Sequence, residues 1–287
     1  MNKGVPSVNV KKKRMKPLRF LKKYGRTIVG ATLIFIVVFC SVFAPFLTQW
    51  DPDEMNMENT KQKPNAEHIM GTDFYGRDIW ARILYGSRNT LLVAILTQIV
   101  VTFVGTIFGL LCGYFKTVEK FLMRFLDAYS TIPGLLMNLM VVSALGTGVG
   151  NLIFAMTINS IPGISRSVRN QVIFVREKEY IESVKAMGAS EVRTIFCHIL
   201  PNISNYLLVR LGAGLAGSIG SMTALSYLGL GLDPTIASWG GIVQEGQELM
   251  FAYPHLTFYA VGAISIAVFG FVLLGDGLRD LLDPRLR

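Results

Sequence analysis

Long apolar stretches, separated by shorter polar segments, dominate the chain. The first runs from Ile28 to Leu47 without a charged residue. A helix that rises about 1.5 Å per residue needs roughly this length to cross the hydrocarbon core of a bilayer. The pattern therefore predicts an all-α, polytopic membrane protein with six transmembrane helices. The other five spans are expected at Leu91–Tyr114, Phe121–Leu145, Asn151–Ile164, Tyr206–Leu228 and His255–Leu274.

The first and fourth stretches depart from a simple span. The first is longer than the roughly 7–15-residue apolar core of a cleavable signal peptide, so we expect it to be retained as a helix. The fourth is the shortest, and Pro162 is expected to interrupt its helix. The limits of the fourth span are therefore the least defined.

Lys and Arg residues are distributed unevenly among the predicted connections. Residues 1–26 hold ten basic side chains and no acidic one, whereas segments 146–150 and 229–253 contain no Lys or Arg. Because short cytoplasmic connections carry the excess of Lys and Arg, both termini are predicted to be cytoplasmic. The expected organisation is a basic tail along anionic membrane lipid (1–26), a first helix (27–48), an extracytoplasmic loop (49–90), a five-helix core (91–274) that includes a cytoplasmic loop (165–205), and a cytoplasmic tail (275–287).

Composition narrows the class of protein further. Hydrophobic residues make up 51% of the chain and charged residues 16%, which excludes an ordinary water-soluble domain. The formal net charge is +9, but the excess lies in the tail rather than on a folded face, so binding to nucleic acid is not expected. Cysteine and histidine do not occur at metal-ligand spacings, and no metal site is predicted.

Small and aromatic residues within and beside the spans predict how the helices pack. Gly105, Gly109 and Gly113 recur every fourth residue and so share one face of the second span, where we expect close packing against another helix rather than a pore lining. Trp50, Trp80 and Trp239 lie near outer span boundaries, where membrane anchoring is the expected role.

Polar residues within the spans are few. The candidates for a substrate path are uncharged: Asn138, Asn159, Ser160, Ser221 and Thr223. Arg210 is expected to extend back to the cytoplasmic headgroups, and Asp127 to pair with Arg124, three residues before it. An ion-driven carrier is expected to have a carboxylate near the middle of the membrane, and neither Asp127 nor Arg210 provides one there.

The third cytoplasmic connection has the pattern of two short helices joined by a turn. Glu179–Met187 is expected to be helical, with Ile181, Val184 and Met187 on one side. Gly188 suits the left-handed position after a helix, and Ser190 is expected to cap the next one. Pro201 is expected to open the following membrane span. Such a helical projection is able to present a rigid face to a cytoplasmic partner, although an ordinary amphipathic connector has the same spacing.

This connection resembles the "EAA" loop of binding-protein-dependent ABC transporter permeases. The similarity rests on Glu182-Ser183-Val184, then Gly188, then Ile199-Leu200-Pro201; Ser183 and Val184 stand where the family prefers alanine. The resemblance implies the fold of a type I ABC importer permease, in which this loop forms a coupling helix that docks on an ATPase subunit. The residues it assigns to coupling are Glu182, Ser183, Val184, Lys185, Ala186, Gly188, Ala189, Ser190 and Pro201.

Three further segments are similar to the dipeptide, oligopeptide and nickel branch of that family, and to its C-type permease subunits. They are the GTDFYGRDIWARILYGSR segment at 71–88, in which Ala81 replaces a serine; Ser226–Gly231 followed by Ser238-Trp239-Gly240; and the C-terminal segment 275–287. The resemblance implies uptake of di- or oligopeptides across the cell (plasma or inner) membrane of a prokaryote, with nickel or a metallophore complex as the alternative.

The chain has no phosphate-binding GxxxxGK[ST] motif and no catalytic triad, so it is not expected to be an enzyme or to bind a cofactor. The resemblance implies that two partner ATPase subunits use ATP and magnesium, that a homologous second permease completes the pore as a heterodimer, and that an extracytoplasmic protein delivers the substrate. An autonomous channel or ion-driven carrier, which would transport without partners, and a membrane-embedded enzyme are the less favoured alternatives.

Overall fold

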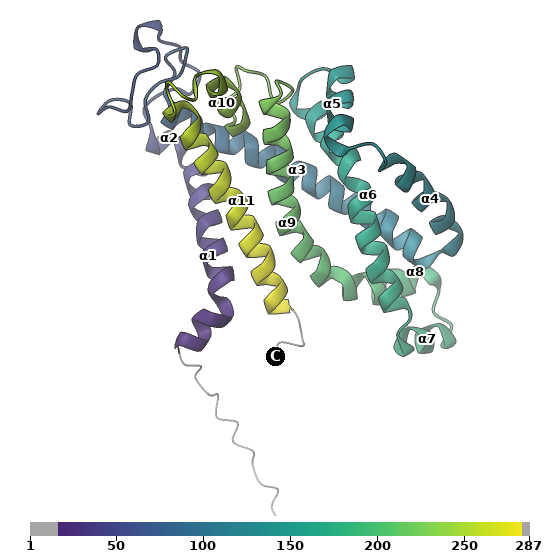
Figure 1. Ribbon diagram of the computed structural model, residues 1–287. Coiled ribbons are helices and arrows are strands. Elements are labelled where there is room, and N and C mark those ends of the chain that lie inside the picture. Colours follow the sequence, from purple (N-terminus) through teal and green to yellow (C-terminus); the bar gives the residue numbers. More distant parts are fainter. Residues whose placement is uncertain (1–16, 283–287) are drawn as a thin grey trace, which may run out of the picture.

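The computed structural model describes residues 17–282, and within that range it consists of helices and loops without a β-strand, as predicted (Figure 1). The five long helices are α1 (Pro17–Val42), α3 (Ile79–Tyr114), α6 (Val149–Arg176), α9 (Leu200–Tyr227) and α11 (His255–Leu282). The shorter elements are α2 (Ala44–Leu47), η1 (Met57–Asn59), α4 (Lys116–Tyr129), α5 (Gly134–Leu145), α7 (Glu179–Ala186), α8 (Glu191–Arg193), the π-helical η2 (Thr194–Ile199), α10 (Trp239–Gly246) and η3 (Gln247–Leu249). Most of the basic tail and the last five residues of the C-terminal tail lie outside the described residues.

The long helices pack as neighbours around α3, which crosses behind the others (Figure 1). Helix α3 packs against α6 and α9, and α11 packs between α1 and α9. One end of the bundle carries residues 48–78 and α10. The opposite end carries α7, the start of α1 and the end of α11 (Figure 1).

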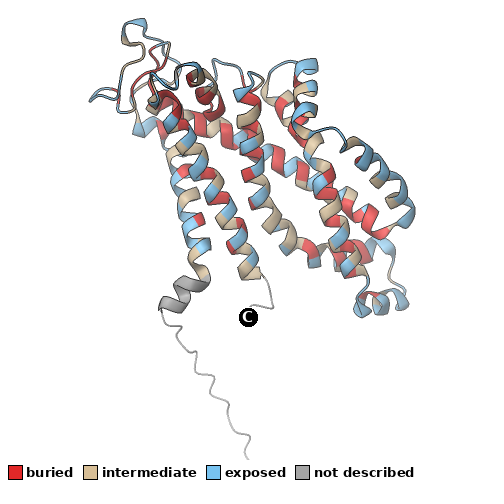
Figure 2. Ribbon diagram, viewed as in Figure 1, coloured by how far each residue is buried: buried red, intermediate tan, exposed pale blue. Residues whose placement is uncertain are grey.

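Large apolar side chains cover much of the outer surface of the bundle. Phe35, Phe103, Phe121 and Phe269 are each more than half exposed, while the buried residues concentrate on α3, α6 and α10 (Figure 2). A water-soluble protein seldom exposes this much contiguous apolar surface, whereas a helix that faces lipid requires it.

The six predicted spans are not confirmed as a count. Four helical segments are long and apolar enough to cross a membrane: Tyr24–Val42, Ile79–Tyr114, Glu191–Tyr227 and His255–Leu282. A fifth candidate is a bent pair of helices, α4 and α5, whose axes differ by 82°. The predicted third span, Phe121–Leu145, is therefore not one straight helix. Pro133 lies directly before α5 and accounts for the break, because a proline disfavours helical conformation in the residue before it.

The fourth predicted span lies within α6, which continues through Pro162 to Arg176. The prediction that Pro162 interrupts the helix was wrong, since packing against α3 supports α6 on both sides of the missing hydrogen bond. Asn159 and Ser160 within the stretch, and Arg166 and Arg169 beyond it, make α6 too polar to count among the spans above.

The glycine stripe on α3 is confirmed as a packing surface. A Cβ atom at Gly109 would lie 2.5 Å from the Cβ of Val168 and 2.9 Å from the backbone oxygen of Ser165, both on α6. Gly105 and Gly113 face Ile164 and Val172 of the same helix at comparably short range. The absence of side chains on α3 therefore sets how closely these two helices approach.

Gly109→Ala is expected to destabilise the protein by about 1–3 kcal/mol, because the added methyl group overpacks the α3–α6 contact. Gly262→Ala on α11 is the matched control, since a Cβ there has no atom within 4 Å. The control is expected to be neutral or to stabilise by up to about 1 kcal/mol through helix propensity. Thermal unfolding in detergent, followed by circular dichroism, measures both; equal shifts for the two variants would contradict the packing role.

Candidate functional site

The predicted coupling segment forms a helix, a turn and a second helix at one end of the bundle. Ile181 of α7 is fully buried among apolar side chains of α3, α6, η2 and α9, among them Val175 and Ile195. Glu182 and Ser183, which lie on other faces of α7, are exposed, and so is Lys185, one turn after Ile181. A buried anchor with an exposed outer face attaches α7 firmly to the membrane helices while leaving it accessible.

The turn after α7 has the predicted backbone geometry. Gly188 has φ of +83° and donates its N–H to the Lys185 carbonyl oxygen at 2.9 Å, the left-handed conformation that glycine adopts at little cost. The Ser190 hydroxyl oxygen then accepts a hydrogen bond from the Arg193 backbone N–H at 3.3 Å and so caps the next helix, also as predicted.

Two details of this segment differ from the prediction. Helix α7 ends at Ala186, and Met187 is 79% exposed rather than packed beside Ile181, because it lies beyond the last helical turn. Pro201 does not open the span: helical structure runs without a break from Glu191 to Tyr227, and Pro201 is the second residue of α9 within it. The π-helical turn before Pro201 accommodates the missing N–H, and the Asn202 side chain donates to the His198 carbonyl oxygen at 2.7 Å.

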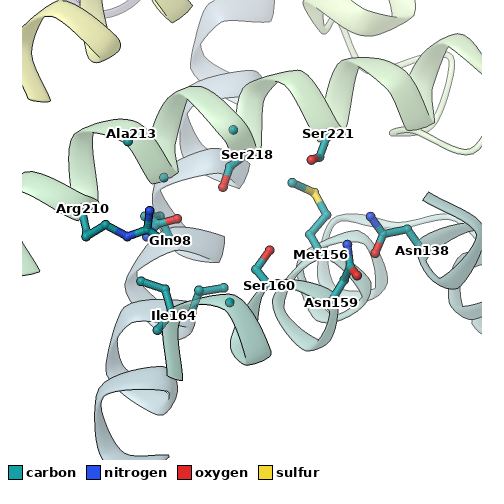
Figure 3. A pocket seen from close by; sticks show the side chains of 14 residues that line it. Gln98, Asn138, Met156, Asn159, Ser160, Ile164, Arg210, Ala213, Ser218 and Ser221 are labelled. Atoms are coloured by element: carbon teal, nitrogen blue, oxygen red, sulfur yellow. The ribbon is translucent and has the colours of Figure 1, made fainter. Parts of the chain in front are cut away.

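A cavity of about 310 Å³ lies between α3, α5, α6 and α9 (Figure 3). Its lining residues on α9 and α6 are spaced by three and four, so that each helix presents one face to the cavity. The lining comprises Gln98 and Val101 of α3, Asn138 of α5, Met156, Asn159, Ser160, Gly163 and Ile164 of α6, and Arg210, Ala213, Gly214, Gly217, Ser218 and Ser221 of α9.

Four of the five residues predicted for a substrate path meet in this cavity: Asn138, Asn159, Ser160 and Ser221. Thr223 does not line it. Two residues beyond Ser221, Thr223 lies on the far side of α9, where its hydroxyl donates to the Ile219 carbonyl oxygen at 2.8 Å. Residue type alone suggested Thr223, and helical phase excludes it.

Sequence reasoning missed Gln98 and Ser218, which complete the polar lining. The Gln98 amide donates to the Thr102 hydroxyl at 3.0 Å. Asn138 is only 2% exposed, and its side-chain oxygen has no hydrogen-bond partner within the described chain. The cavity therefore offers amides and hydroxyls with unused hydrogen-bonding capacity.

The charged residues within the helices also differ from expectation. Arg210 lines the cavity beside Gln98 instead of extending to the headgroups (Figure 3). Asp127 pairs not with Arg124 but with Arg166 of α6, whose Nε lies 3.0 Å from its carboxylate. Glu119 likewise binds Arg169 of α6, so two ion pairs attach α4 to α6 across sequence separations that a local pattern does not predict.

The other end of the bundle is held by a buried network of charges. Glu245 of α10 accepts hydrogen bonds from Arg77 at 2.7 Å and from Arg82 at 3.0 Å, and Asp73 accepts one from Arg77 at 2.6 Å. Both guanidinium groups are at most 2% exposed. Burial raises the pKa of Glu245, and the nearby Arg82 and Arg77 oppose that rise without reversing it. The network joins the 71–78 segment to α10.

Trp239 belongs to this end of the bundle and is not a membrane anchor. Its side chain is 2% exposed, and its indole N–H donates to the Ile83 carbonyl oxygen at 3.0 Å. The indole of Trp50 instead donates to the Glu67 carbonyl oxygen at 3.3 Å, and that of Trp80 to the Leu47 carbonyl oxygen at 3.2 Å.

Among the described residues, no group of three or more His, Cys, Asp or Glu is placed to hold a metal ion.

The sequence is similar to those of known transport proteins. Residues 105–287 match the family described as the binding-protein-dependent transport system inner membrane component. The chain is 36% identical over 268 residues to a dipeptide transport system permease protein of Alkalihalophilus pseudofirmus, an alignment that covers 93% of this chain and 88% of the relative.

Two other relatives are similar over comparable lengths. An oligopeptide transport system permease protein of Bacillus subtilis is 34% identical over 260 residues, with 90% of this chain and 85% of the relative covered. A glutathione transport system permease protein of Pectobacterium atrosepticum is 34% identical over 271 residues, with 94% and 90% covered. The chain therefore belongs to the inner-membrane permease family of binding-protein-dependent transport systems: it is not an enzyme but the membrane-spanning permease subunit of an ABC importer, which works with ATPase subunits and a substrate-binding protein.

Proposed function

We propose that this permease forms one half of a heterodimeric pore for di- or oligopeptides. The observation that carries the proposal is the cavity between α3, α5, α6 and α9, where amide and hydroxyl groups from four helices meet. Such groups both donate and accept hydrogen bonds, and so suit a peptide backbone without selecting among side chains. The names of the relatives, which refer to dipeptide, oligopeptide and glutathione transport, support the same substrate class over nickel.

Helix α7 and the turn at Gly188 are the proposed docking surface for an ATPase subunit. Ile181 fixes α7 to the cluster that contains Val168 and Val172 of α6 and Ile203 of α9. Displacement of α7 by the ATPase would therefore move α6 and α9, which line the cavity. ATP and magnesium would be used by the ATPase subunits, and this chain would bind neither.

The two ends of the bundle support an orientation. The end with α7 would face the cytoplasm, together with the start of α1 and the end of α11, and the end with residues 48–78 and α10 would meet the binding protein (Figure 1). The six Lys and Arg residues between Arg166 and Arg193, and the lack of any in 229–253, follow the distribution expected of that orientation.

The assembled transporter, reconstituted in liposomes with its binding protein, is expected to take up a labelled dipeptide or short peptide only when ATP is enclosed with the ATPase subunits. Nickel salts supplied in place of peptide are expected to give no ATP-dependent uptake. Uptake by this chain alone without ATP would contradict the coupled mechanism, and uptake of nickel but not peptide would contradict the substrate class.

A further inference from the structure

The cavity contains one fixed charge. Among its described lining residues, Arg210 is the only Arg, Lys, Asp or Glu, and the others have amide, hydroxyl or apolar side chains or are glycines. No carboxylate of the described chain lies within ion-pairing distance of Arg210, and its Nε atom is buried without a hydrogen-bond partner. A partly buried cation with no anion beside it gains free energy when an anion binds to it.

Other arginines of the chain are used differently. Arg77, Arg82, Arg166 and Arg169 each bind a carboxylate of another element or a neighbouring turn. Arg176 donates to the carbonyl oxygens of Gly113 and Tyr114, both at 2.9 Å. These arginines are partnered by the fold. Arg82 also has buried donors without a hydrogen-bond partner, but it lies beside Asp73 and Glu245. Arg210 has an unpartnered donor and no such carboxylate in the described chain.

The position of Arg210 matches one end of an extended peptide. Arg210 and Ser221 are eleven residues apart on the same face of α9, which corresponds to about 16 Å along the helix. An extended chain covers roughly 3.3–3.6 Å per residue, so this length accommodates a short peptide. The neutral amides and hydroxyls lie along the cavity, with Arg210 beside Gln98 at one end and Asn138 toward the other (Figure 3).

We propose that Arg210 recognises the carboxylate of the transported solute, and that the permease therefore favours solutes with a free carboxylate over their amidated counterparts. The inference rests on the proposed peptide-import function. A guanidinium binds a carboxylate through two parallel N–H donors, a geometry that a neutral amide at the C terminus of a peptide cannot reproduce. Arg210 would set the orientation of the peptide, and the uncharged lining would accept peptides of different sequence.

The test compares a peptide that has a free C terminus with the same peptide amidated, in the complete transporter reconstituted with its partners. Each peptide is first titrated against the binding protein, and uptake is compared at equal saturation, so that selection by the binding protein does not enter. In the wild type, the free peptide is expected to be taken up faster. In Arg210→Gln, uptake of the free peptide is expected to fall about tenfold while that of the amide stays unchanged.

Two further variants separate recognition from structure. Arg210→Lys keeps the charge but not the paired donors, and is expected to retain an intermediate preference for the free peptide. Arg124→Gln removes an exposed arginine of α4 and is expected to keep the wild-type preference.

The outcomes are distinct. An equal loss of both peptides in Arg210→Gln, as expected if Arg210 pairs with a carboxylate of the second permease, would overturn the inference, and so would an unchanged ratio. If the wild-type transporter takes up neither peptide, the proposed function itself fails, and this inference fails with it.

Discussion

Replacing Gly188 by proline is expected to abolish most of the substrate-stimulated ATP hydrolysis of the assembled transporter while the permease remains in the membrane. Gly188 has φ of +83°, whereas a proline ring holds φ near about −65°. Proline also removes the N–H that donates to the Lys185 carbonyl oxygen. The turn must therefore rearrange, and the exposed face of α7 moves relative to α8 and η2. Coupling free energies between sites correspond to factors of about 5–150, so we expect stimulation to fall about tenfold or more.

Membrane insertion provides the internal control for this variant. A Cβ at Gly188 has no atom within 4 Å, and the residue lies outside the apolar segments, so the change is not expected to disturb the helix bundle. Gly188→Asn is the matched variant, because asparagine enters the left-handed region more readily than other side chains. It is expected to keep most of the stimulated activity. Wild-type stimulation in Gly188→Pro would show that this turn does not transmit motion.

The turn at Gly188 could be predicted from the sequence because its chemistry is local. A glycine after an amphipathic run, followed by a serine two residues later, determines the end of one helix and the cap of the next without help from distant residues. Pro201 was misassigned for the converse reason. The π-helical turn that precedes it depends on the packing of Ile195 and Ile199 against α3 and α6, which no local pattern reports.

The cavity was predictable only in part. Asn138, Asn159, Ser160 and Ser221 were found because polar residues within apolar helices are rare, but residue type does not say which face of a helix a side chain occupies. The helical spacing from Arg210 to Ser221 was available in the sequence and would have added Ser218 and removed Thr223. Whether Arg210 turned to the cavity or extended to the cytoplasmic headgroups depended on the neighbouring helices.

The start of α3 could not be predicted from the sequence. Residues 79–90 were assigned to the 49–90 loop, since the second span was predicted to begin only at Leu91. The segment contains the polar residues Arg82, Arg88 and Asn89. In the structure each has a partner far away in the sequence: Arg82 binds Glu245, Arg88 donates to the Ser41 carbonyl oxygen at 2.6 Å, and Asn89 donates to that of Ala237 at 2.7 Å. The helix therefore begins at Ile79, with the Asp78 carboxylate accepting from the Ala81 N–H.

The same long-range partners imply a large effect when Glu245 is changed. Glu245→Ala is expected to destabilise the protein by about 3–5 kcal/mol, because it leaves two guanidinium groups, each at most 2% exposed, to share Asp73. Since burial already raises the pKa of Glu245, the intact network contributes little net stability, and the loss comes from uncompensated buried charge. In thermal unfolding of the detergent-solubilised protein we expect the Tm to fall by about 10 °C.

An exposed ion pair of the same chain provides the control for this prediction. Arg26 and Asp280 lie 3.9 Å apart with side chains 69% and 42% exposed, so Asp280→Asn is expected to change stability by no more than about 1 kcal/mol. Glu245→Gln keeps an oxygen acceptor without the charge and should fall between the two. If Glu245→Ala melts no lower than Asp280→Asn, then water or movement of α10 compensates the arginines, and the segment 71–78 and α10 are not held together by this network.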